Sequence, residues 1–239
     1  MSDSTSRKGN SRESARTRRG AAATAESSRV RLTSAERQAQ IADSTLQLMA
    51  RYGLQGTTVS RIAEEVGMEA PSLYAHFPSR KDMLLAAVDA LFQRVAKHLS
   101  LGNEAENALE QLRTLGESHA TFITQEFDGF VMPIFEFMTA SRDSGLSEAV
   151  GERQRRTLDT LAAYVEEGKR QGVIREDVDS RLAAYEMMLL FWAEDVTQLM
   201  AIDEFVTEGI SNKILEVFLR DMAVSEQPTS DKKSNKGES

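Results

Sequence analysis

The chain has 239 residues, no cysteine and only four prolines. The absence of cysteine excludes disulfides, a cysteine nucleophile, iron–sulfur clusters and thiolate zinc sites. The net charge of −8 is uneven, because residues 1–31 carry +5, residues 32–82 carry −1 and residues 83–239 carry −12. A basic segment ahead of an acidic body suggests that only the N-terminal end meets a polyanion, although simple solvation also explains such a segment.

No segment of the sequence is apolar enough to cross a membrane. The longest strongly apolar run, residues 187–193, is seven residues long, whereas a spanning helix needs about 20. The N-terminal residues also lack the apolar core of a secretory signal. We therefore expect a cytoplasmic protein with no membrane segment.

The first ordered elements are helices with clear start and stop signals. Residues 1–31 are rich in Ser, Arg, Thr, Ala and Gly, so we expect a disordered basic arm. Thr33 and Glu36 then have the spacing of a capping box. Apolar residues recur at helical spacing from Ile41 to Tyr52, and Gly53 is expected to end this helix.

Two short helices and a long one are predicted next. Thr58 is placed to cap a short helix that Gly67 ends. A second short helix is predicted from about Ala70 to His76, with Pro71 in its first turn. The long helix begins at residues 79–82 and closes near residues 101–103.

The rest of the chain is also predicted to be helical. No run of 4–8 residues has the alternation of a strand, so the expected fold class is all-α. The expected helices cover about residues 104–126, 130–142, 146–171, 180–200 and 203–222, and residues 223–239 form a second disordered tail. Residues 187–193 are apolar all round, which predicts burial on more than one side of that helix.

Residues 45–85 have the pattern of a helix-turn-helix, in which two short helices follow a longer supporting helix. Inward positions of the first short helix are apolar, and Ala63 and Gly67 are small where the two helices must approach closely. Leu73 and Phe77 are the inward positions of the second, whose outer face is left to meet the major groove. The inward set of the first helix is Val59, Ile62, Ala63 and Val66.

Over about 40 residues this segment resembles the TetR family of bacterial transcription regulators. The matching residues are Thr57, Thr58, Val59, Ile62, Ala63, Gly67, Leu73, Tyr74, His76, Phe77 and Lys81 to Leu84. The resemblance implies a three-helix DNA-binding domain over residues 32–82 and a helical effector-binding and dimerisation domain over residues 83–222. It also implies a homodimer through the last two helices that binds double-stranded DNA at a palindromic operator.

The resemblance implies DNA contacts in and around the second short helix. It places Tyr74 and Lys81 against phosphates, whereas Ser72 is the best candidate for a base contact. Each residue also has a structural alternative, such as a core aromatic for Tyr74, a cap or packing residue for His76 and a solvated charge for Arg61. The full candidate set is Thr57, Thr58, Arg61, Ala70, Pro71, Ser72, Tyr74, Ala75, His76 and Lys81.

Two features of this helix depart from the expected pattern. Glu69 stands where the family usually has a Ser or Thr cap, and it places a negative charge beside the DNA phosphates. The helix also has no Arg, Asn or Gln, the residues that make bidentate base contacts. Shape readout and the basic arm are therefore expected to contribute.

The effector is expected to be a small, largely apolar molecule bound in the C-terminal domain. Candidate residues are aromatic, Met and His side chains, which can equally be core: His119, Phe122, Phe135, Met138, Tyr185, Met188 and Trp192. Glu186, Glu194 and Asp195 form ion pairs or lie at a rim, or alternatively contact a cationic ligand. No motif indicates a metal site, a cofactor or an enzyme.

The predicted function is a sequence-specific transcriptional regulator, namely a repressor that a small-molecule effector releases from its operator. The alternative is a helical small-molecule sensor whose helix-turn-helix no longer binds DNA, which Glu69 and the missing base-reading side chains motivate.

Overall fold

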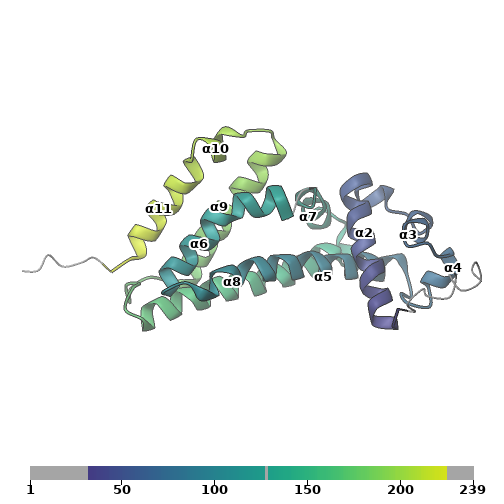
Figure 1. The fold of residues 1–239 in the computed structure, drawn as a ribbon, viewed down its shortest axis with the longest axis horizontal. Coiled ribbons are helices and arrows are strands. Elements are labelled where there is room, and N and C mark those ends of the chain that lie inside the picture. Colours follow the sequence, from purple (N-terminus) through teal and green to yellow (C-terminus); the bar gives the residue numbers. More distant parts are fainter. Residues whose placement is uncertain (1–31, 127–128, 225–239) are drawn as a thin grey trace, which may run out of the picture. The chain divides into compact units, whose positions relative to one another are not determined.

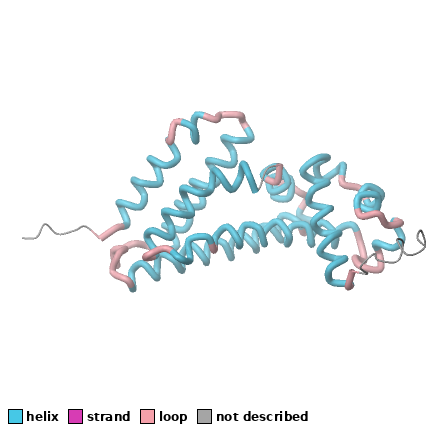
Figure 2. Tube along the Cα trace, viewed as in Figure 1, coloured by secondary structure: helices cyan, strands magenta, loops and turns pink. Residues whose placement is uncertain are grey.

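The computed structural model describes residues 32–126 and 129–224. Within these ranges the chain is helical and contains no strand, apart from one isolated bridge between Ile174 and Ala223 (Figures 1 and 2). The predicted all-α fold class is therefore confirmed. The predicted basic arm of residues 1–31 and nearly all of the predicted 223–239 tail lie outside the described residues.

Helix α2 (Ser34–Gly56) begins with the predicted capping box. The carboxylate of Glu36 accepts from the backbone N–H of Thr33 at 2.7 Å, and the Thr33 hydroxyl accepts from the N–H of Glu36 at 3.2 Å. Near the other end, Gly53 has φ 67° and ψ 176°, so regular α2 stops where predicted and one further turn follows. A positive φ of this kind favours glycine.

The two short helices are α3 (Val59–Glu65) and α4 (Ala70–Leu73). The Thr58 hydroxyl caps α3 by accepting from the N–H of Arg61, and Gly67 turns the chain with φ +65°. The prediction that α4 reaches His76 is wrong, because residues 75 and 76 bond three residues back instead of four. Such tighter bonds end the α-helix just before the Phe77–Pro78 step.

Helix α5 (Arg80–Leu99) starts at the cap Ser79, and a 3-10 turn covers Leu101–Glu104. Further on lie α6 (Ala108–Thr121), a π-helical turn (Phe122–Glu126), α7 (Val131–Met138) and a 3-10 turn (Arg142–Ser144). The predicted 104–126 helix begins later because Asn107 caps α6 by accepting from the N–H of Glu110. The predicted 130–142 helix ends at Met138.

The last elements are α8 (Leu146–Arg170), α9 (Ser180–Leu199), α10 (Glu204–Thr207) and α11 (Ile210–Met222). The single helix predicted over residues 203–222 is broken at Gly209, which has φ +66°. Helix α6 packs against α8, α9 and α11, and α8 packs along α9. No helix of the described residues is long and apolar enough to cross a bilayer.

The buried apolar residues form three clusters. The first holds the helix-turn-helix together and contains Ile41, Leu48, Ile62, Ala63, Val66, Leu73 and Met83. The second joins Leu46 and Met49 of α2 to α5, the 122–126 turn and α7. The third fills the space among α6, α8, α9 and α11. The predicted inward positions of α3 and α4 therefore lie inward, although Val59 and Phe77 are only half-buried.

Candidate DNA-binding face and effector cavity

The helix-turn-helix exposes the candidate DNA-binding residues on the side opposite its apolar cluster. Leu73 is fully buried, whereas its neighbour Tyr74 has 50% of its surface exposed. Ala70 and His76 are half-buried. The exposed candidates are Thr58, Arg61, Pro71, Ser72, Tyr74, Ala75 and Lys81. Helix α4 thus presents to solvent side chains that take no part in the apolar cluster.

Thr57 does not share this surface, and its predicted DNA contact is not compatible with the structure. The residue is fully buried, and its hydroxyl donates to the carbonyl of Gly53 at 2.8 Å. Its backbone N–H also donates to the Gly53 carbonyl. Thr57 therefore closes the turn that connects α2 to α3.

Two charged side chains near this face have neighbours within the described chain. Arg61 donates to the carbonyl of Gly56 at 2.6 Å, and its guanidinium lies 4.5 Å from the centre of the Tyr52 ring. Lys81 is exposed, but its ammonium lies beside Gly145, the residue before α8. Glu69, the residue before α4, makes no side-chain capping bond in the described part of the chain.

Three segments meet at a junction that the sequence did not reveal. The Glu136 carboxylate on α7 accepts from the N–H of Leu54 at 2.6 Å, just after the kink at Gly53. The Arg80 guanidinium at the start of α5 donates to the carbonyls of Leu54 and Thr57. These bonds fix the segment that leads into the Thr58 cap of α3, so α7 is tied directly to the helix-turn-helix.

A small cavity of about 50 Å³, partly open to the surface, lies among α5, α6, α8 and α9. It brings together four of the seven predicted effector residues, namely His119, Phe122, Met188 and Trp192. The other three do not line it. Phe135 and Met138 pack on the second apolar cluster, and Tyr185 is 46% exposed with the Arg181 guanidinium above its ring.

His119, which lines this cavity, has a buried carboxylate as its partner. Nδ1 of His119 lies 2.7 Å from Oε2 of Glu194, whose side chain is only 2% exposed, and the His119 ring stacks on Phe191. His98 stacks on Phe122 with ring centroids 4.2 Å apart. The proximity of His98 and His119 could not be predicted from the sequence, because the two residues lie on different helices. Their ring centroids are nevertheless 6.0 Å apart.

Burial shifts the titration of two groups in the cavity. Burial, with a smaller contribution from the charge of His119, lowers the pKa of His98 from 6.5 to about 4, so its imidazole is neutral at pH 7. Burial raises the pKa of Asp195 from 3.8 to about 6. No group of three or more potential metal ligands occurs among the described residues.

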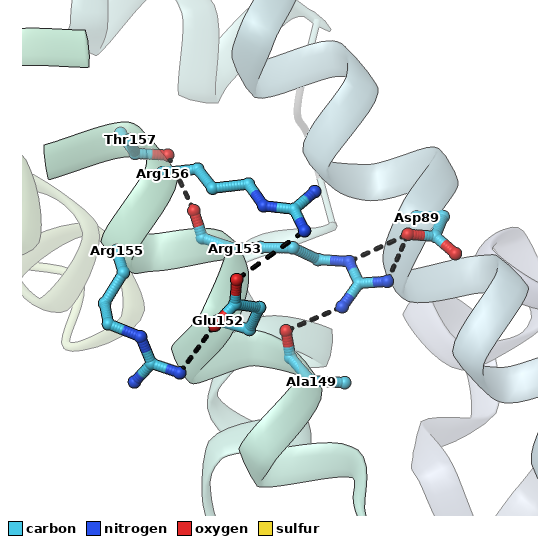
Figure 3. A network of polar contacts seen from close by, with 7 residues as sticks. All are labelled: Asp89, Ala149, Glu152, Arg153, Arg155, Arg156 and Thr157. Atoms are coloured by element: carbon cyan, nitrogen blue, oxygen red, sulfur yellow. Dashed lines mark hydrogen bonds and ion pairs between the residues drawn. The ribbon is translucent and has the colours of Figure 1, made fainter. Parts of the chain in front are cut away.

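An arginine-lined groove of about 310 Å³ adjoins this cavity on the outside of α5 and α8. Arg153 forms an ion pair with Asp89 of α5 and donates to the carbonyl of Ala149 (Figure 3). Glu152 pairs with Arg155 at 2.8 Å and with Arg156 at 3.6 Å. The hydrogen bond from Arg155, followed by its charge, holds the pKa of Glu152 below its usual value.

Helices α9 and α11 present apolar side chains to the outside of the chain. A groove of about 810 Å³ runs between them. Leu182 and Leu189 of α9 are 57% and 59% exposed, and Ile214 and Val217 of α11 are each 47% exposed. In the single chain Met187, Met188, Leu190 and Phe191 are buried. Leu189 and Trp192 reach the surface, so the predicted burial of residues 187–193 on a second side depends on a partner subunit.

Known proteins resemble both the helix-turn-helix and the overall fold. A model of bacterial regulatory proteins of the tetR family matches residues 41–87. The HTH-type transcriptional repressor KstR2 of Rhodococcus jostii is 28% identical over 156 residues, which cover 62% of this chain and 72% of that protein.

Solved structures share the fold over most of this chain. The regulator FadR of Bacillus subtilis, in complex with stearoyl-CoA, is 22% identical with a TM-score of 0.64 and covers 75% of this chain and 96% of its own. AibR, in complex with isovaleryl coenzyme A and operator DNA, is 20% identical with a TM-score of 0.54 and covers 78% and 98%. The family match and these likenesses agree: residues 41–87 match the helix-turn-helix of the tetR family of bacterial regulatory proteins, and the described chain shares its fold with solved regulators.

Proposed function

We propose that the chain is a dimeric DNA-binding repressor whose operator affinity falls when a small molecule binds among its C-terminal helices. The observation that carries this proposal is the exposed face of α4, where Ser72 and Tyr74 are accessible while Leu73 anchors the helix in the core. A helix held in this way can enter the major groove as a recognition helix. Such a regulator acts in the cytoplasm, on DNA.

Residues 32–82 serve as the DNA-binding domain and residues 83–222 as the effector-binding and dimerisation domain. The exposed apolar side chains of α9 and α11 support a two-fold dimer, because contiguous apolar surface of this kind marks interaction sites. We expect Leu189→Glu to convert the dimer to a monomer in size-exclusion chromatography with light scattering. A dimer that persists in this variant would exclude α9 as the interface.

The effector is an acyl-CoA. FadR and AibR, which share the fold, each bind a CoA thioester. In this chain an apolar cavity adjoins a groove with Arg153 and Arg156, and arginine suits phosphate groups. Since an effector shifts an equilibrium only by its unequal affinity for two states, the thioester must bind the DNA-released conformer more tightly.

The α4 face can be tested by fluorescence anisotropy with duplex DNA from upstream of the chain's own gene. Tyr74→Phe removes only the hydroxyl and Ser72→Ala only the candidate base contact. Each is expected to weaken binding about tenfold, since a hydrogen bond to a charged or base group contributes about 1–3 kcal/mol. Thr121→Ala, at an exposed position of α6, is the matched control and should bind as the wild type does.

The second candidate is a sensor that no longer binds DNA. Glu69 favours it, since this exposed carboxylate next to α4 makes no side-chain capping bond among the described residues and would repel DNA phosphates. Under this alternative, DNA binding is weak, independent of sequence, and unchanged in Tyr74→Phe and Ser72→Ala.

A further inference from the structure

The small cavity contains buried polar atoms that the protein itself leaves unpaired. His98 is only 4% exposed, and neither of its ring nitrogens makes a hydrogen bond of good geometry among the described residues, although the backbone of Leu115 is close enough to oppose the lowering of its pKa. Oδ1 of Asp195 is likewise buried and unpaired within the described chain. A buried polar atom without a partner is costly, so these atoms are suited to a ligand's polar group.

The charges around the cavity determine which polar group is acceptable. Glu194 is already paired with His119, and neutral His98 cannot compensate the charge of Asp195. Gln154 and Thr157 face the cavity from α8, and no Lys or Arg is among the described residues that line it. The interior therefore carries an excess negative charge at pH 7 and disfavours a second anion.

The outer groove instead contains two arginines, Arg153 and Arg156, and one carboxylate, Asp89, which pairs with Arg153. Phe92, Leu99 and Thr157 border both the cavity and the groove, so the two hollows are neighbours. Arg153 and Arg156 line the groove, and Arg155 lies one residue away on the same helix (Figure 3). The cavity of about 50 Å³ has room for a thioester group and little more. One molecule can thus place its anionic carrier at the groove and its uncharged thioester at the cavity.

We propose that His98 and Asp195 make the site specific for the esterified form of an acyl group and exclude the free carboxylic acid. The inference rests on the proposed function, because it assumes an acyl effector. The uncharged thioester carbonyl accepts a hydrogen bond from the N–H of neutral His98. A free carboxylate in the same place repels the carboxylate of Asp195, whereas the phosphates of the carrier remain at Arg153 and Arg156.

The test is isothermal titration calorimetry on the full-length protein without DNA. The probes are isovaleryl-CoA, dodecanoyl-CoA and stearoyl-CoA, the sodium salts of the three acids, CoA alone and dodecylamine. We expect at least one thioester to bind about tenfold or more tightly than both its own acid and CoA. Two like charges a few ångströms apart in a protein repel by more than the 1.4 kcal/mol that a tenfold change represents.

Variants separate the two roles. Asp195→Asn should strengthen binding of the free acid about tenfold and change thioester binding by less than about twofold, because only the acid meets the removed charge. His98→Phe should weaken the thioester about tenfold by removing the N–H donor. Arg156→Gln should weaken thioester binding, while Arg170→Gln, an equally exposed arginine of the same helix, is the control.

Several outcomes would overturn the proposal. They are equal binding of acid and thioester, unchanged acid binding in Asp195→Asn, tighter binding of dodecylamine than of every thioester, and no binding of any thioester. Because DNA is absent, each outcome leaves the operator measurement with Tyr74→Phe and Ser72→Ala as a separate test of the repressor function.

Discussion

The junction of Glu136 with Leu54 provides the sharpest test of how the C-terminal helices hold the helix-turn-helix. Glu136→Ala removes a charge-assisted bond of 2.6 Å and leaves the N–H of Leu54 without that acceptor. Such bonds contribute about 1.5–3 kcal/mol, and the half-buried position of Glu136 favours the lower end of this range. For a domain of this size, about 1.5 kcal/mol corresponds to a fall in Tm of roughly 3–6 °C.

The same variant should also weaken communication with the effector cavity. Helix α7 directs Ile134 into the cavity and Glu136 to the segment that precedes α3, so a movement of α7 reaches the helix-turn-helix through this bond. We expect the acyl-CoA to lower operator affinity less in Glu136→Ala than in the wild type. The coupling available for loss is about 1–3 kcal/mol in typical allosteric proteins.

Thermal unfolding followed by circular dichroism measures the stability change, and anisotropy with and without the thioester measures the coupling. Glu136→Gln keeps an acceptor oxygen and should lose only about 0.5–1 kcal/mol. Glu117→Ala, at an exposed position of α6, controls for the loss of one carboxylate. Wild-type stability and wild-type coupling in Glu136→Ala would refute the role of this junction.

Two further predictions concern packing and pH. A Cβ at Gly116 would lie 2.5 Å from the Leu215 side chain, whereas one at Gly151 meets nothing closer than 3.8 Å. Gly116→Ala should therefore destabilise the fold by about 1–3 kcal/mol and Gly151→Ala stabilise it by up to about 1 kcal/mol, as urea denaturation would show; equal effects would contradict the packing. Because the pKa of Asp195 is raised, folding takes up a proton between pH 6 and 4, and the wild type gains free energy of unfolding as the pH falls through this window. Asp195→Asn lacks this gain, so its free energy of unfolding should fall behind that of the wild type by about 3 kcal/mol. Because the pKa of His98 is lowered, the wild type loses free energy of unfolding as the pH falls from 6.5 to 4, and His98→Gln, which lacks this loss, should gain stability relative to the wild type. Parallel pH profiles for variant and wild type would contradict both assignments.

The local features of the fold could be predicted because their signals are short in sequence. The Thr33–Glu36 box, the Thr58 cap and the turn at Gly67 each depend on residues within four positions. The inward face of α3 followed from apolar spacing alone. The end of α4 differs from the prediction, because the sequence shows that Pro78 stops the helix but not how many residues before Pro78 it stops.

The cavity and the junction were not predictable in the same way. Leu54 and Glu136 are 82 positions apart, and His119 and Glu194 are 75 apart, so nothing in the local pattern pairs them. Tyr185 was an expected effector residue because aromatic side chains line ligand sites, but its turn of α9 faces outward. Thr57 was misassigned because a helix-start threonine has the same local pattern whether it faces DNA or closes a turn.

DNA recognition by the α4 face is tested most directly by the selection of bound sequences from random duplex DNA with the full-length protein. We expect enrichment of a palindrome whose half-site centres are separated by about 34–36 Å, one turn of DNA. We further expect that Ser72→Ala relaxes the preference at one position in each half-site and that the acyl-CoA releases the selected DNA. Recovery of no enriched sequence, or of the same sequence and affinity with Ser72→Ala and Tyr74→Phe, would contradict DNA recognition by the α4 face.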